Sequence, residues 1–133
     1  MDDDARIARK RILIIEDERE ISLILRRRLE SFGYEGIEAY DGQEGLKQAK
    51  SCSPDLIVLD LVLPSMSGIQ ILKELKKTPA YQHIPIVIVT GLAQDMPGVK
   101  ECAGEADAYF LKPFDSVELV ATIADFFKNP KKT

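Results

Sequence analysis

The chain of 133 residues has no tryptophan, one histidine and only two cysteines, and it has no long apolar run. Because a membrane-spanning helix needs about 18 or more apolar residues, we expect no membrane span. Cys52 and Cys102 are 50 positions apart and form no CxxC pair, which argues against a disulfide framework or a zinc site. The N-terminus lacks the apolar segment of a signal peptide, so we expect a cytoplasmic protein.

An excess of positive charge is also missing. The 18 Lys and Arg residues are outnumbered by 22 Asp and Glu, which gives a net charge of −4. Nucleic-acid-binding modules need a basic face to displace counterions from phosphates, so direct nucleic-acid binding is not expected. Hydrophobic residues make up 45% and charged residues 30% of the chain, which is typical of a globular domain. We therefore predict a single domain over 1–133, with its core at about 10–128.

Short apolar segments alternate with amphipathic ones along the chain. The apolar segments predict strands at about 12–15, 36–40, 55–59, 85–89 and 108–111. Unbroken apolar runs without polar alternation are typical of strands that are buried on both faces. Between them, apolar residues recur at helical spacing, with Ile21, Ile24, Leu25, Leu29 and Phe32 expected inward in the first stretch and Val117, Val120, Ile123, Ala124 and Phe127 in the last.

Several helix boundaries can be predicted from capping residues. Capping boxes, in which a short polar residue is followed three positions later by Glu or Gln, occur at Asp41–Glu44, Ser67–Gln70 and Asp115–Glu118. Gly33 follows the first helical stretch at the position of a C-terminal cap. The helix between 95 and 104 is expected to start late and to be short, because Pro97 and Gly98 interrupt it.

This alternation predicts an α/β fold, a doubly wound parallel sheet of five strands with helices on both faces. Right-handed crossovers place functional groups of such a sheet at the carboxyl ends of its strands, near the point where the strand order changes direction.

Ionisable residues stand at three of these strand ends, Glu16 and Asp17 after the first strand, Asp60 after the third and Lys112 after the fifth, and Thr90 ends the fourth. Three carboxylates at one edge repel each other, by roughly 4 kcal/mol per pair at about 4 Å and an effective dielectric near 20. A cation removes this cost, and hard oxygen ligands with open coordination positions favour Mg²⁺. An Asp beside Mg²⁺, a lysine and a hydroxyl is suited to phosphoryl transfer through an aspartyl-phosphate.

The residues that carry this constellation lie in four segments, Ile12–Glu18, Asp55–Gly68, Ile86–Gly91 and Ala106–Phe114. In order and spacing they resemble the receiver domain of two-component response regulators, over about residues 10–128. The resemblance implies the flavodoxin-like (βα)5 fold with strand order 2-1-3-4-5.

The resemblance also implies a role for each site residue. Asp60 would be the phosphoacceptor, and Thr90 and Lys112 would bind the phosphoryl oxygens. Glu16, Asp17, Asp60 and the backbone carbonyl of Val62 would hold Mg²⁺. Tyr109 would change rotamer together with Thr90, and the Lys112–Pro113 peptide would be cis.

As the resemblance implies, the phosphoryl donor would be a sensor histidine kinase or a histidine phosphotransferase. A target protein, or a second copy of the chain, would bind the face formed by the helix within 95–104, the strand 108–111 and the last helix. The transfer would be self-catalysed rather than the turnover of a metabolite. Loss of the phosphoryl group would be slow, because the apolar Val62 and Leu92 flank the path of the attacking water. Whether the chain is a stand-alone shuttle or a part of a larger regulator or hybrid kinase stays open.

Three sequence features depart from the family pattern. Glu16 stands where Asp is usual, which leaves the charge intact, and Glu105 stands where a glycine is usual before Ala106. The interruption at Pro97 and Gly98 falls within a helix of the signalling face.

Two other functions would each require a motif that this sequence does not match. A haloacid-dehalogenase-like phosphohydrolase would need an Asp-x-Asp-x-Thr motif, but Val62 and Pro64 occupy its second and third functional positions. A flavodoxin-like FMN carrier would need a phosphate-binding loop after the first strand, where Glu16, Asp17 and Glu18 would repel a phosphate.

Overall fold

Five parallel strands form one sheet in the order β2-β1-β3-β4-β5 in the computed structural model, which describes residues 9–128. The strands are β1 (Arg11–Ile15), β2 (Glu35–Ala39), β3 (Leu56–Leu59), β4 (Ile86–Thr90) and β5 (Ala108–Leu111). The helices are α2 (Arg19–Ser31), α3 (Gly42–Ser51), α4 (Gly68–Lys76), α5 (Lys100–Ala103) and α6 (Ser116–Lys128). The fold and strand order expected from the sequence are therefore confirmed.

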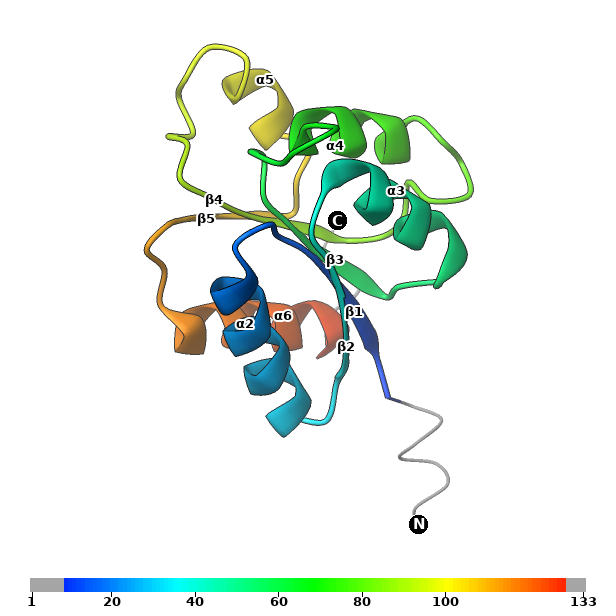
Figure 1. Cartoon of the computed structure of the whole chain (residues 1–133), viewed down its shortest axis with the longest axis vertical. Helices are drawn as coiled ribbons and strands as arrows, with labels where there is room; N and C mark the ends of the chain where they lie inside the picture. The colour runs from blue at the N-terminus through cyan, green and yellow to red at the C-terminus, as the bar shows by residue number, and fades with distance from the viewer. Residues whose placement is uncertain (1–8, 129–133) are drawn as a thin grey trace.

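The helices cover the sheet from both sides. Figure 1 shows α2 and α6 on one face and α3, α4 and α5 on the other. Successive residues of β1 point to opposite faces, so that Leu13 and Ile15 pack toward α3, whereas Ile12 and Ile14 pack toward α2 and α6. All four are fully buried, as expected for a central strand of a doubly wound sheet. No helix among residues 9–128 is long and apolar enough to cross a membrane.

The predicted helix starts are present, with differences in detail. Ser67 and Gln70 form a complete capping box at α4. Asp41 caps α3 by accepting a hydrogen bond from the backbone N–H of Glu44, but the Glu44 carboxylate accepts from Gln48 instead of completing the box. Helix α5 has only four residues and begins after Gly98, which has a positive φ of 87°, as its proline and glycine predicted.

Three apolar side chains expected to point inward are exposed. On α2 the buried stripe consists of Ser22, Leu25 and Leu29, which leaves Ile24 on the flank and Phe32 at the helix end, 57% and 63% exposed. On α6 the buried stripe is centred on Leu119, Val120 and Ile123, so Val117 in the first turn is 66% exposed. These expectations were wrong because helical spacing alone does not give the rotation of a helix about its axis.

Two glycines allow close backbone contacts at the carboxyl edge of the sheet. A Cβ atom on Gly42 would lie 1.8 Å from the carbonyl oxygen of Met66, and one on Gly68 would lie 2.1 Å from that of Asp60. Around Gly91 and Gly98, in contrast, a Cβ would have no atom within 4 Å. The loop from β3 to α4 is thus tightly packed at Gly42 and Gly68. The loop from β4 to α5 has open space at Gly91 and Gly98.

A hydrogen-bond network joins α2 to the edge strand β2 through the Glu38 carboxylate. It accepts hydrogen bonds from the Ser22 hydroxyl at 2.8 Å, from the Tyr40 hydroxyl at 2.8 Å and from the Arg26 guanidinium. Burial on its own would raise the pKa of Glu38, but these hydrogen bonds hold it below its ordinary value of 4.5. The ionised carboxylate therefore stabilises the folded state.

We expect Glu38→Gln to lower the free energy of unfolding by about 2 kcal/mol at neutral pH, the usual scale for hydrogen bonds to a charged group. Because the folded pKa is lowered, the contribution is present above the ordinary value of 4.5 and is lost as pH falls through the folded pKa. Urea unfolding at neutral and acidic pH measures both effects. Glu35→Gln, on the same strand, is the control, because the Glu35 side chain is 41% exposed and its ion pair is with the 38% exposed Arg11. An equal loss in both variants would contradict this role of Glu38.

Candidate functional site

Three carboxylates come together where β1 and β3 end, next to the point at which the strand order changes direction. Glu16 and Asp17 follow β1, Asp60 follows β3, and one oxygen from each lies within 4.8 Å of the others. Glu16 and Asp60 are 2% and 4% exposed, whereas Asp17 faces the solvent. The structure thus brings together the three side chains expected from the sequence, here called the acidic cluster.

Lys112, which follows β5, inserts its ammonium group among these carboxylates. Its Nζ lies 2.8 Å from Oε1 of Glu16, 2.9 Å from Oδ2 of Asp60 and 3.0 Å from Oε1 of Glu18. The other oxygen of Asp60, Oδ1, accepts a hydrogen bond of 3.1 Å from the backbone N–H of Val62. Both oxygens of Asp60 are therefore held in place, and the Lys112–Pro113 peptide is cis, as expected.

Burial changes the protonation of this site. Burial raises the pKa of Glu16 from 4.5 to about 7, although its hydrogen bond from Lys112 acts in the opposite direction. For Lys112, burial on its own lowers the pKa, but hydrogen bonds to Glu16, Asp60 and Glu18 outweigh burial and raise it. Lys112 is therefore protonated at neutral pH. A second cation at the acidic cluster would favour the ionised form of Glu16.

Thr90 lies at the end of β4 and is completely buried. Its Oγ1 is the one buried side-chain oxygen or nitrogen among the described residues that has no hydrogen-bond partner. Buried polar atoms are nearly always paired, so this unpaired hydroxyl stands out among the side chains at the carboxyl edge of the sheet. The Thr90 carbonyl accepts a 2.8 Å hydrogen bond from the backbone N–H of Lys112, which ties the two strand ends together.

The remaining residues expected from the sequence surround this arrangement. The Tyr109 hydroxyl donates a 2.7 Å hydrogen bond to the carbonyl of Leu92, in the loop from β4 to α5. Val62 follows Asp60 by two positions and is 56% exposed, and Leu92 is half-buried. No polar side chain therefore occupies either position.

One contact was not foreseen from the sequence, the ion pair between Glu18 and Lys112 at 3.0 Å. Glu18 is the N-cap residue of α2, but its side chain makes no capping hydrogen bond. Glutamate is not among the usual N-cap residues, and this was the signal that could have indicated another partner for it.

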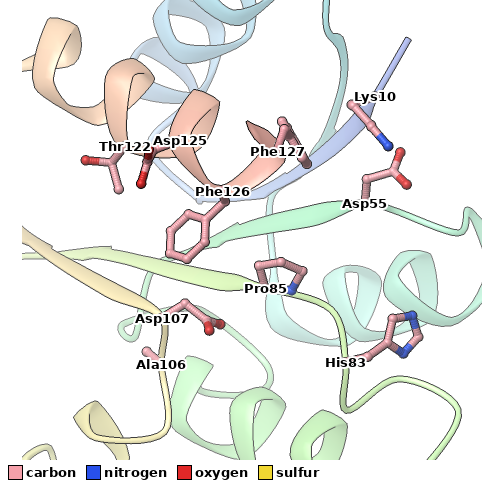
Figure 2. Close-up of a pocket in the computed structure, with 10 residues that line it drawn as sticks. All are labelled: Lys10, Asp55, His83, Pro85, Ala106, Asp107, Thr122, Asp125, Phe126 and Phe127. Carbon is pink, nitrogen blue, oxygen red and sulfur yellow. The ribbon is translucent and has the colours of Figure 1, made fainter. Parts of the chain in front are cut away.

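A cavity of about 660 Å³ lies elsewhere, where α6 meets the amino ends of the strands (Figure 2). Phe126 and Phe127 line it together with Asp55 and Asp107. These two carboxylates accept 2.8 Å hydrogen bonds from the backbone N–H groups of Arg11 and Ile86, respectively. They thus hold the strand starts together, and the cavity contains no residue of the site described above.

The family model described as "response regulator receiver domain" matches residues 12–124 of the chain. Among curated proteins, the chain is 33% identical over 121 residues to the phosphate regulon transcriptional regulatory protein PhoB of Rhizobium meliloti, covering 91% of the chain and 53% of that protein. It is 39% identical over 114 residues to the alkaline phosphatase synthesis transcriptional regulatory protein PhoP of Bacillus subtilis, covering 86% and 47%. The chain thus spans about half the length of these relatives.

Solved structures agree with this match. A CheY-like response regulator receiver domain protein from Methanospirillum hungatei superimposes with a TM-score of 0.84 at 30% identity, covering 94% of the chain and 98% of that structure. The response regulator protein TrrA of Thermotoga maritima, solved in complex with Mg²⁺-BeF, gives a TM-score of 0.77 at 31% identity, covering 87% and 97%.

Proposed function

The chain belongs to the response regulator receiver domain family, and on that premise we propose that it is a phosphorylation-dependent switch that accepts a phosphoryl group on Asp60. The observation that carries the proposal is the combination around Asp60. Its carboxylate is fixed by Lys112 and by the backbone of Val62, and the buried Thr90 hydroxyl nearby has no partner. A phosphoryl oxygen would supply that partner.

The transfer can be written from the residues present. An oxygen of Asp60 attacks the phosphorus of a phosphohistidine, a new O–P bond forms, and the P–N bond breaks. The released imidazole nitrogen keeps the electron pair and takes a proton from water. Lys112 and Thr90 hold the phosphoryl oxygens as charge moves onto them.

The acidic cluster fits Mg²⁺, because three carboxylate oxygens within 4.8 Å of one another are the hard ligands that this ion prefers. Glu16, Asp17, Asp60 and the backbone carbonyl of Val62 would hold it. Bound there, Mg²⁺ supplies positive charge that offsets repulsion between the carboxylates and the incoming phosphate.

Acetyl phosphate provides the direct test of this function. Intact mass should show the addition of one phosphoryl group in the presence of Mg²⁺, and excess EDTA should prevent it. Peptide mapping after the acyl-phosphate is trapped should place the label on Asp60. Absence of any label under these conditions would contradict the proposal.

In this proposal, phosphorylation of Asp60 changes the positions of the Thr90 and Tyr109 side chains. When Thr90 turns toward the phosphoryl group, the Tyr109 hydroxyl gives up its bond to Leu92, and the face formed by α5, β5 and α6 changes shape. The donor is a sensor histidine kinase or a histidine phosphotransferase. A target protein or a second copy binds that face, and this chain itself does not contact nucleic acid.

We further propose that residues 1–133 form one receiver domain, either a stand-alone shuttle or part of a larger regulator or hybrid kinase. The free thiols of Cys52 and Cys102 support the assignment to a reducing compartment such as the cytoplasm.

Mg²⁺ is expected to raise the melting temperature of the domain through binding to the folded state. At ten times its dissociation constant the gain is about 1.4 kcal/mol, or roughly 3–8 °C for a domain of this size. Asp17→Asn should abolish this shift, because the variant loses a ligand, and should relieve repulsion without metal. Asp107→Asn, at the opposite end of the sheet, should keep the shift. Thermal melts with and without Mg²⁺ measure the shift in melting temperature. An unchanged shift in Asp17→Asn would show that Asp17 is not a ligand of the metal site.

The phosphorylated form is expected to decay slowly, since neither Val62 nor Leu92 can orient the attacking water. The double variant Val62→Asn, Leu92→Glu should lose its label faster by a factor on the order of ten, a part of the usual gain from general acid–base help. Release of inorganic phosphate after removal of the donor measures the rate. Val117→Asn, on an exposed valine of α6, is the control. Equal decay of the double variant and the parent would contradict the role of these two side chains.

A further inference from the structure

We propose that Glu18 is a positioning residue that holds Lys112 before phosphorylation and must release it when an anionic donor enters. The inference rests on the proposed function of Asp60. Its basis is the ion pair of 3.0 Å between Glu18 Oε1 and Lys112 Nζ. The backbone N–H of Glu18 donates a 3.0 Å hydrogen bond to Oε2 of Glu16, which fixes Glu18 next to the acidic cluster.

The ammonium group of Lys112 is surrounded by carboxylates, with hydrogen bonds to Glu18 and Asp60 and an ion pair with Glu16. An ammonium group has three N–H donors, and three carboxylates, those of Glu16, Glu18 and Asp60, lie within 3.0 Å of Nζ. A phosphoryl oxygen can bind Lys112 only if one of them withdraws. Glu16 is buried and Asp60 is the acceptor itself, whereas the Glu18 side chain is 59% exposed and can turn into water at little cost. Glu18 is thus the replaceable partner.

The start of α2 provides an independent observation. Glu18 occupies the N-cap position, where a side chain normally accepts a hydrogen bond from the first turn of the helix. Its carboxylate makes no such bond and pairs with Lys112 instead. The start of α2 therefore lacks the stabilisation that a capping side chain would give, because the Glu18 carboxylate contacts Lys112 instead.

Glu18 also changes the charge that an incoming donor meets. With Mg²⁺ and Lys112 in place, the three carboxylates of the acidic cluster are neutralised. The Glu18 carboxylate then remains beside Lys112 as one uncompensated negative charge, and this charge repels a dianion such as acetyl phosphate. Removal of this charge should favour anion binding, and the gain should shrink at about 1 M salt, where charges are screened within about 3 Å.

The test compares Glu18→Gln with Glu20→Gln, which removes the same charge from an exposed residue in the first turn of α2. Both measurements are made in the presence of Mg²⁺. The first is the acetyl phosphate concentration at which the labelling rate is half-maximal. The second is the beryllium fluoride concentration at which the rise in melting temperature is half-maximal. The second needs no phosphoryl transfer. Both should fall about two- to fivefold in Glu18→Gln, the scale of one exposed ion pair, and stay unchanged in Glu20→Gln.

Glu18→Ser separates this role from helix stability. Serine is a good N-cap, so the melting temperature of the metal-free variant should stay level or rise, while both half-saturation concentrations still fall. Unchanged half-saturation in Glu18→Gln, in a protein whose parent is labelled on Asp60, overturns the inference and leaves the proposed function intact. A parent that takes no label on Asp60 overturns both.

Discussion

The Asp60→Asn variant is expected to take up no phosphoryl group from acetyl phosphate. Asparagine keeps the size of the side chain, but its neutral amide replaces the attacking carboxylate oxygen. The neighbouring acids are poor substitutes. Glu16 is 2% exposed with a pKa raised to about 7, and Asp17 faces solvent without a contact to Lys112 among the described residues. Asp60 alone combines a contact to Lys112 with a hydrogen bond from the backbone of Val62.

Intact mass with Mg²⁺ and acetyl phosphate measures this loss. Asp55→Asn is the matched control. Asp55 immediately precedes the first residue of β3, at the end of the strand opposite to Asp60, and it accepts a hydrogen bond from the backbone N–H of Arg11. The control should be labelled like the parent. Full labelling of Asp60→Asn, with the label mapped to another acid, would show that the acceptor lies elsewhere.

Lys112→Met should destabilise the metal-free domain by about 3–5 kcal/mol, the usual cost when one partner of a buried ion pair is removed. Methionine fills similar space, so the loss reports the missing charge. Two nearly buried carboxylates, those of Glu16 and Asp60, would then face each other without a cation. Urea unfolding without Mg²⁺ measures the effect, and Lys77→Met, on a lysine whose side chain is 72% exposed, should change stability by less than about 0.5 kcal/mol.

The loss in Lys112→Met should depend on pH in a defined direction. The folded pKa of Glu16 lies above its ordinary value of 4.5, so ionised Glu16 destabilises the folded state. This cost is complete above the folded pKa and disappears as pH falls toward 4.5. The deficit should therefore be smaller at about pH 5.5 than at about pH 8, and Mg²⁺ should reduce it. A deficit that is equal at both pH values and insensitive to Mg²⁺ would show that packing, not charge, is responsible.

The sequence predicted the sheet well because its central strands are unbroken apolar runs. The edge strand β2 was placed one residue late, at 36–40 instead of Glu35–Ala39. Four of its five residues are half-buried, so its apolar signal is weak, and pairing of Glu35 with Arg11 sets its start. The rotation of α2 and α6 depends on tertiary packing, which explains the exposure of Ile24 and Val117.

The candidate site could be predicted from topology, because residues that follow parallel strands must meet at one edge. Glu16, Asp60 and Lys112 meet there as expected. The pairing of Glu18 could not be found in this way, since its direction depends on the turn between β1 and α2. The cavity beside α6 was likewise invisible in the sequence, because it forms where Phe126 packs near strand starts that lie far apart in the chain.

The close contacts of Gly42 and Gly68 have a mechanical consequence for any change at Asp60. On the side of the loop from β3 to α4, a Cβ atom on either glycine would overlap a backbone carbonyl oxygen, so there is no room there for even one methyl group. On the side of the loop from β4 to α5, Gly91 and Gly98 have free space, and α5 has only four residues. Free space at this edge of the sheet therefore lies beside Gly91 and Gly98, and the rearrangement proposed above for Thr90 would use the side that faces α5.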